Sequence, residues 1–198
     1  MTFIRLGYVA MSVHLPNSSP SHTMTLTHFQ KLDDREAAIN KLATIAKKNL
    51  TNCLRLLRYN LENDISFFRF SSKLLPLGTH DVVADLDIYE PLEEELAAIR
   101  AFLSEHPQVR VDFHPDHFVI LNSPKAEVLH QSIKTLDMHW HLLKRFGLDP
   151  KHRCVLHIGG GYGNKEKALE QFIHNWGFVP PHIQSMIILE NDDKTFSV

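Results

Sequence analysis

The chain has 198 residues, of which 43% are hydrophobic and 22% charged, and its formal net charge is −2. This length allows one domain with a proper core, and the composition is ordinary for a soluble globular protein. The charge balance gives no support to a large basic surface, so any contact with DNA would have to be a local patch. No stretch approaches the roughly 18 apolar residues of a membrane span. Cys53 and Cys154 lie in apolar surroundings without paired spacing, so we expect a cytoplasmic protein with reduced cysteines and no membrane partner.

Short apolar runs alternate with longer amphipathic segments along the chain. The runs predict five strands, at Phe3–Tyr8, Ile65–Phe70, Val109–Phe113, Cys154–Leu156 and Met186–Leu189. The resulting order, βαβαβαβαβ, is typical of a parallel sheet with helices on its faces. No linker divides the chain, so we expect a single domain over residues 1–198.

Four helices are predicted between these strands. The first begins at Asp33, which forms a capping-box pattern with Glu36. The second begins near Pro91, and the third covers residues 125–146 and ends before Gly147. The fourth is capped by Asn164, and we expect its inward face to contain Ala168, Phe172 and Ile173.

Residues with metal-binding side chains follow three of the five strands. The strand ends are Tyr8, Ser71-Ser72, His114, His157 and Glu190. In parallel α/β folds the ligand site lies beyond the carboxyl ends of the strands. A single histidine there is more often a hydrogen-bonded structural residue, and a single glutamate more often a helix cap. Two imidazoles and a carboxylate at one edge, however, form a ligand set that suits zinc, manganese or iron.

The stretch VLHIGGGYGNK, residues 155–165, could instead be a phosphate-binding loop. It lacks the Gly-Lys-Ser/Thr ending of a P-loop, because Glu166 follows Lys165, and Asn164 occupies the last position of the dinucleotide-binding pattern. We therefore interpret the glycines as residues that allow a tight turn after a strand, with His157 facing the site.

The same junctions resemble the UV damage endonucleases, DNA repair enzymes related to the endonucleases that cut at abasic sites. The matching pieces appear in family order and are Leu6-Gly7-Tyr8, FRFSSKLLPLGTH (68–80), His114-Pro115 with Phe118, HIGG with YGNK (157–160 and 162–165), and LENDD (189–193). The resemblance implies a TIM (β/α)8-type barrel and a multi-metal centre, commonly manganese, with zinc or magnesium as alternatives.

The resemblance also implies an activity and a set of site residues. The expected activity is hydrolysis of the phosphodiester 5′ to a UV photoproduct or similar lesion in double-stranded DNA, which leaves a 3′ hydroxyl. His114, His157 and Glu190 match the catalytic metal ligands, and Glu190 matches a ligand that bridges two metals. The residues expected to contact DNA or the lesion are Tyr8, His117, Phe118, Tyr162, Asn164 and Lys165.

Two features depart from the family pattern. His117 stands where the family usually has glutamine, which affects hydrogen-bond recognition at that position. Only about the first five β/α units of a barrel are present, and the family's further Asp, His and Glu ligands lie beyond them. We therefore expect a partial barrel over 1–198 that is inactive alone. Two alternatives stay open, a metal-dependent sugar isomerase or epimerase of the same barrel type and a DNA-binding remnant that recognises damage without cutting.

Overall fold

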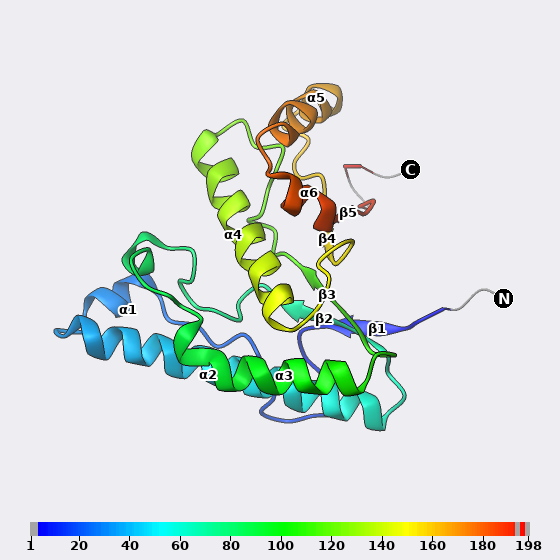
Figure 1. Ribbon diagram of the computed structural model, residues 1–198. Helices are drawn as coiled ribbons and strands as arrows, with labels where there is room; N and C mark the ends of the chain where they lie inside the picture. Colours follow the sequence, from blue (N-terminus) through cyan, green and yellow to red (C-terminus); the bar gives the residue numbers. More distant parts are fainter. Residues whose placement is uncertain (1–3, 193–194, 197–198) are drawn as a thin grey trace. The chain divides into compact units, whose positions relative to one another are not determined.

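The computed structural model describes residues 4–192 and 195–196, which form two compact units (Figure 1). One contains residues 4–112 and 145–147, and the other residues 113–144, 148–192 and 195–196. The strands are β1 (Gly7–Val9), β2 (Phe67–Ser71), β3 (Arg110–His114), β4 (Cys154–Leu156) and β5 (Ile187–Leu189). They form one sheet in chain order, and the β1–β2, β3–β4 and β4–β5 pairs are parallel. The predicted α/β fold with a parallel sheet is confirmed.

The first unit is built around one long helix. Its helical segments are α1 (Leu26–Gln30), α2 (Arg35–Glu62), the 3-10 turns Asp81–Val83 and Glu90–Leu92, and α3 (Glu93–Glu105). Helices α2 and α3 lie side by side in Figure 1. The inner face of α2 buries Leu42, Leu50, Leu56 and Leu57, whose spacing follows the helical period. The core of this unit therefore lies along α2.

The helices of the second unit are α4 (Ala126–Arg145, whose last residue belongs to the first unit), α5 (Lys165–Trp176) and α6 (Pro181–Met186). Helix α4 ends at Arg145, and Gly147 follows with φ +75°, as expected for a glycine that stops a helix. Asn164 caps α5 as predicted, because its side-chain oxygen accepts a hydrogen bond from the Lys167 amide at 3.0 Å.

Some predicted details are wrong. The N-cap of α2 is Asp34, whose carboxylate accepts from the Glu36 amide, so Asp33 does not start a capping box. Ile173 is 72% exposed and does not face the core. The short helices α1 and α6 were not predicted, because neither is long enough to show a helical period. Of the first strand expected at Phe3–Tyr8, Phe3 lies outside the described residues, and residues 4–6 are not in the strand, because β1 begins at Gly7.

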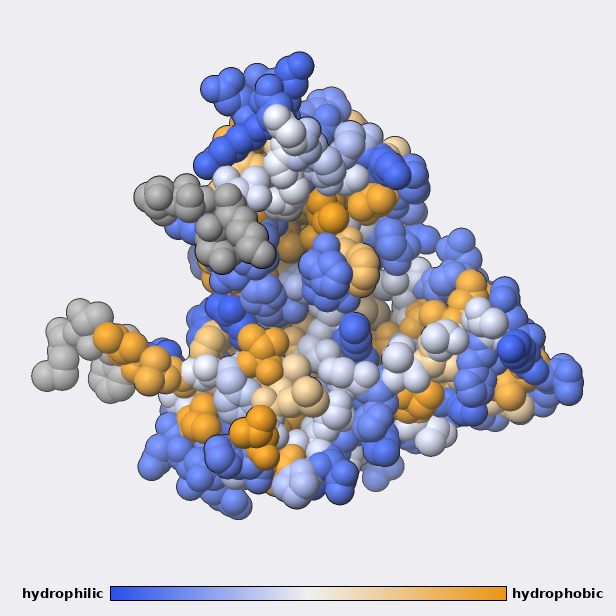
Figure 2. All heavy atoms as spheres, turned by 180° about the vertical axis from the view of Figure 1, so that it is seen from behind, coloured by the Kyte–Doolittle hydropathy of each residue, from blue (hydrophilic) through white to orange (hydrophobic). Residues whose placement is uncertain are grey.

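Apolar side chains are exposed where β1 begins and just after it. Ile4, Leu6 and Val13 are 79%, 81% and 94% exposed, and Figure 2 shows apolar side chains at the molecular surface. Among the described strands, β1 pairs with β2 alone. None of the helices in the described part of the chain combines the length and apolar character needed to cross a membrane.

Replacing Gly7 by alanine should destabilise the first unit. A methyl group at Gly7 would overlap the carbonyl group of Phe67, its partner in the β1–β2 register. Because backbone atoms cannot rotate away as a side chain can, we expect Gly7→Ala to lower the free energy of unfolding by about 1–3 kcal/mol. Urea unfolding followed by circular dichroism measures this change.

Gly177→Ala is the matched control. Gly177 has helical dihedral angles, and a methyl group there would meet the nearest atom at an ordinary 3.4 Å. This variant should change the free energy of unfolding by less than about 1 kcal/mol. Equal losses in the two variants would show that close approach of β1 to β2 is not what requires glycine at position 7.

Candidate metal centre

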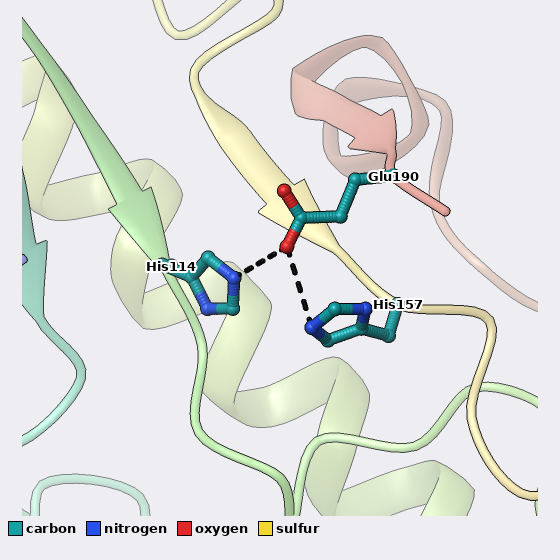
Figure 3. Close-up of side chains that lie close together, drawn as sticks. All are labelled: His114, His157 and Glu190. Atoms are coloured by element: carbon teal, nitrogen blue, oxygen red, sulfur yellow. Dashed lines mark hydrogen bonds and ion pairs between the residues drawn. The ribbon is translucent and has the colours of Figure 1, made fainter. Parts of the chain in front are cut away.

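Three side chains meet at the carboxyl ends of adjacent strands in the second unit. His114 is the last residue of β3, His157 directly follows β4, and Glu190 directly follows β5. Glu190 Oε1 lies 2.7 Å from His114 Nε2 and 3.3 Å from His157 Nε2 (Figure 3). One potential ligand atom from each of the three lies within 4.8 Å of the others. The predicted convergence of these side chains is confirmed.

The ring of His114 is oriented by a backbone carbonyl group. Its Nδ1 lies 3.1 Å from the Pro115 carbonyl oxygen, which can only accept a hydrogen bond, so Nδ1 carries a proton in this contact. Nε2 is then the atom directed at Glu190 and the atom that could bind a metal. A metal-binding histidine is commonly fixed in this way through its other nitrogen.

The strand that presents His114 is anchored behind it. Phe113 is fully buried, and its ring stacks on that of His139 of α4 at a centroid distance of 4.2 Å and an interplanar angle of 6°. Because successive residues of a strand point to opposite faces, burial of Phe113 against α4 directs His114 to the other face. The metal-binding side chain is thus positioned by core packing.

The glycine loop after His157 packs against a buried asparagine. Asn122 is fully buried, and its side-chain nitrogen donates to the Gly160 carbonyl oxygen at 2.7 Å. Gly159 has φ +122°, and a methyl group there would overlap Asn122 Oδ1. The glycines therefore allow a tight turn and close packing, which supports this interpretation over a phosphate-binding loop.

A second buried amide holds Asn122 in place. Asn175 of α5 donates from its side-chain nitrogen to the carbonyl oxygens of Leu121 and Ser123, at 2.7 and 2.9 Å. The loop after β3 is thus tied to α5 and, through Asn122, to the loop after β4. Sequence analysis missed both asparagines, because nothing in the pattern of a single sequence separates a buried asparagine from one in an exposed turn.

The other residues predicted to contact DNA in this unit are exposed, and all lie on loops except Lys165, the first residue of α5. Phe118 is 69% exposed, and its ring lies 4.0 Å from that of His117, centroid to centroid. Tyr162 is 55% exposed, and the Lys165 ammonium lies 5.6 Å from the centroid of the Phe196 ring. The side-chain oxygen of Asn164 is engaged in capping α5. These positions leave the rings of Phe118 and Tyr162 accessible to a ligand.

Tyr8 belongs to the first unit. Its hydroxyl donates to Asn60 Oδ1 of α2 at 2.6 Å, and its ring meets the edge of Phe68. Burial raises the pKa of Tyr8, while the hydrogen bond to Asn60 lowers it by a smaller amount. The hydroxyl of Tyr8 is therefore used within its own unit.

The two imidazoles and the carboxylate suit a divalent transition metal. Neutral imidazole nitrogen and carboxylate oxygen together are typical ligands for zinc, manganese or iron. Over residues 4–192 and 195–196, no other group of three His, Cys, Asp or Glu residues brings its ligand atoms as close together. Because the side chains of His114, His157 and Glu190 are only partly exposed, at 21%, 46% and 30%, the site is sheltered yet open to solvent.

Known proteins are similar to this chain over almost all of its length. The model of the family UV-endonuclease UvdE matches residues 4–198. A UV DNA damage endonuclease from Halalkalibacterium halodurans is 53% identical over 195 residues, which are 98% of this chain and 60% of that protein. One from Bacillus cereus (strain ATCC 10987) is 38% identical over 196 residues, with the same shares.

A solved structure has the same arrangement of elements. The crystal structure of SacUVDE matches with a TM-score of 0.81 and 31% sequence identity, and the match covers 98% of this chain and 63% of that one. This likeness confirms the predicted barrel-type α/β fold. The chain spans about 60% of the length of the curated relatives it matches.

Glu190→Gln should weaken metal binding without changing the fold. The substitution keeps the shape of the side chain and removes the negative charge between the two imidazoles. Since loss of an outer-shell contact alone typically costs 10–100-fold in metal affinity, we expect a loss of at least about 100-fold for manganese. Calorimetric titration with Mn²⁺ measures it.

Asp137→Asn is the matched control for this titration. Asp137 also lies beside two histidines, His182 at 2.8 Å and His141 at 3.5 Å, but it lies on the surface and outside the centre. Its replacement should leave manganese affinity unchanged. If both variants bound manganese like the wild type, His114, His157 and Glu190 would not be the metal site.

Proposed function

The chain belongs to the UvdE family of UV endonucleases, and from this premise we propose that it functions in a metal-dependent DNA repair endonuclease. The proposed reaction is hydrolysis of the phosphodiester 5′ to a UV photoproduct or similar lesion, leaving a 3′ hydroxyl. The observation that carries this proposal is the convergence of His114, His157 and Glu190 in a chain that matches the family model over residues 4–198.

His114, His157 and Glu190 are the proposed ligands of a divalent cation, and manganese is the first choice. When bound, such a cation supplies a hydroxide near neutral pH and stabilises charge on the scissile phosphate and leaving oxygen. The protein's own part is to hold the ligands. Pro115 fixes the proton of His114 on Nδ1, and Glu190 Oε1 offers one oxygen to the space shared by both imidazoles.

The exposed aromatic residues of the second unit are proposed to contact damaged DNA. Phe118 is an apolar side chain at the tip of a loop and could enter the base stack, which costs less where a lesion has already weakened stacking. His117 lies against it and could donate a hydrogen bond to a base. Tyr162, on the loop after β4, could contact a base, and Lys165, the first residue of α5, could contact a phosphate.

We further propose that residues 1–198 correspond to the first five β/α units of a longer barrel. The chain covers 60% of relatives that bear the endonuclease name, and two histidines and one glutamate suffice for about one metal. A two-metal mechanism needs additional ligands. The same observation favours one alternative, a protein that binds damaged DNA without cutting it.

A nicking assay separates these possibilities. The substrate is a duplex with a single photoproduct, incubated with Mn²⁺. We expect little cutting by the 198-residue chain and strong cutting by a chimera in which the remaining 40% of the Halalkalibacterium halodurans protein is appended to it. In the chimera, His157→Ala should reduce the rate by at least about 100-fold, because it removes a ligand of the metal that activates water.

Asp137→Asn in the same chimera should cut at the unaltered rate. Equal cutting by the 198-residue chain and the chimera would contradict the partial-barrel proposal. A chimera that binds damaged duplex but never nicks it would favour the binding protein over the endonuclease.

Phe118→Ala should reduce discrimination between damaged and intact DNA. The loss of one stacking or wedging side chain is worth about 1–3 kcal/mol, so affinity for the damaged duplex should fall roughly 5- to 150-fold. Affinity for the intact duplex should change little. Fluorescence anisotropy with both duplexes measures the ratio, and an equal loss on both would indicate a folding defect.

A further inference from the structure

The outer face of α2 is basic, although the whole chain carries a net charge of −2. Residues 37–61 of this helix include five basic residues and no acidic one; the basic residues are Lys41, Lys47, Lys48, Arg55 and Arg58. Lys41, Lys48 and Arg55 are exposed and recur every seven residues, so they line one side of the helix. Exposed threonines, Thr44 and Thr51, lie between them.

Only part of this face is free to bind a ligand. Arg55 donates to the carbonyl oxygens of Asn17 and Pro16, and Lys41 lies 3.1 Å from the His28 ring nitrogen. Arg58 lines a hollow that also contains the carboxylates of Glu62 and Glu105. Lys48 has no hydrogen bond or ion pair to any residue that the structure describes. Lys48 is therefore the cation to consider.

Lys48 lies at a pocket between α2 and the loop that follows β1. The pocket has a volume of about 470 Å³, and no carboxylate lines it. Its polar lining includes Lys48, His22, Ser12 and Ser19. The hydroxyl oxygen of Ser19 accepts from the Ser21 amide, which leaves the Ser19 hydroxyl proton available to a ligand, whereas the Ser12 side chain is also hydrogen-bonded to Tyr8. A lysine with a nearby hydroxyl donor and no carboxylate in the lining suits an anionic ligand.

The wall of this pocket is held firmly by α2. The fully buried Asn49 donates to the His22 carbonyl oxygen and accepts from the His22 amide, each at 2.9 Å. Asn52 donates to the Ser19 carbonyl oxygen at 2.8 Å, and Arg55 holds Asn17. A loop fixed in advance loses little conformational entropy when it binds, so this pocket is preorganised.

We propose that the pocket formed by Lys48, His22, Ser12 and Ser19 binds a phosphate of the DNA backbone. This proposal rests on the proposed function and adds a contact in the first unit, whereas the candidate metal centre lies in the second. The apolar side chains of Met11 and Val13, 56% and 94% exposed, adjoin the phosphate site and suit the sugar of the same nucleotide. Contacts to phosphate and sugar position a protein on DNA without reading sequence.

Substitutions at Ser19 and Lys48 test the pocket. Ser19→Asp and Ser19→Asn both keep a side-chain oxygen for the Ser21 amide and have nearly the same size, but only aspartate brings a negative charge. Ser19→Asp should weaken binding of an undamaged, labelled duplex by more than about tenfold relative to Ser19→Asn. Lys48→Ala should weaken it about eightfold at 0.1 M salt and reduce the slope of log K against log salt by about 0.9, the value for one phosphate.

Lys48→Arg should restore binding, and Lys151→Ala, which removes an exposed lysine of the other unit, should bind like the wild type. All titrations use the 198-residue chain in EDTA, followed by fluorescence anisotropy, with circular dichroism to verify folding. Equal affinity of Ser19→Asp and Ser19→Asn would overturn the proposal. So would a Lys48-dependent affinity for phosphatidylserine vesicles, or for an acidic peptide, that exceeds affinity for the duplex.

The outcome is separable from that of the proposed function. Undamaged duplex in EDTA reports on the backbone contact alone, since neither cutting nor the lesion is involved. If the chimera nicks photoproduct DNA but the Ser19 and Lys48 variants bind normally, the pocket proposal fails by itself. If the chimera never nicks while the variants lose binding, the pocket stands and the endonuclease proposal fails.

Discussion

The meeting of two imidazoles at one oxygen of Glu190 depends on the direction of the strands. Parallel strands place all their carboxyl ends at one edge, so residues that directly follow successive strands become neighbours although dozens of residues separate them in sequence. His114, His157 and Glu190 each stand at or directly after a strand end. A shift of one residue in any of these strands would turn the side chain to the other face of the sheet.

Buried side-chain amides hold the loops that follow the parallel strands. In the second unit Asn175 and Asn122 tie the loops after β3 and β4 together, and in the first unit Asn49 and Asn52 fix the loop after β1 to α2. Loops carry backbone groups without partners in secondary structure, and a buried amide satisfies several of them at once. The recurrence of asparagine in this role makes the loops at both proposed binding sites rigid.

The sequence predicted those features that depend on local pattern. Strand ends and the Asn164 cap follow from apolar runs and from capping chemistry within a few residues. Features set by tertiary contacts could not be predicted in this way. Ile173 was expected inside because its spacing continues an apolar stripe, yet nothing covers that side of α5 among the described residues. Asp34 rather than Asp33 caps α2, because the choice between adjacent aspartates depends on where the chain turns into the helix.

In the part of the chain that the structure describes, two groups have a carboxylate between two histidines, and only one is suited to a metal. At Asp137 the histidines contact different oxygens, at 2.8 and 3.5 Å, and the three side chains are 42–47% exposed on helical surfaces. Such exposed ion pairs contribute little to stability, because water screens the charges and because holding the two side chains in one geometry costs conformational entropy. At Glu190 a single oxygen faces both Nε2 atoms, His114 is fixed through its other nitrogen, and Phe113 is packed behind it. A metal requires ligand atoms that already converge, and strand ends anchored in a core provide this where helix surfaces do not.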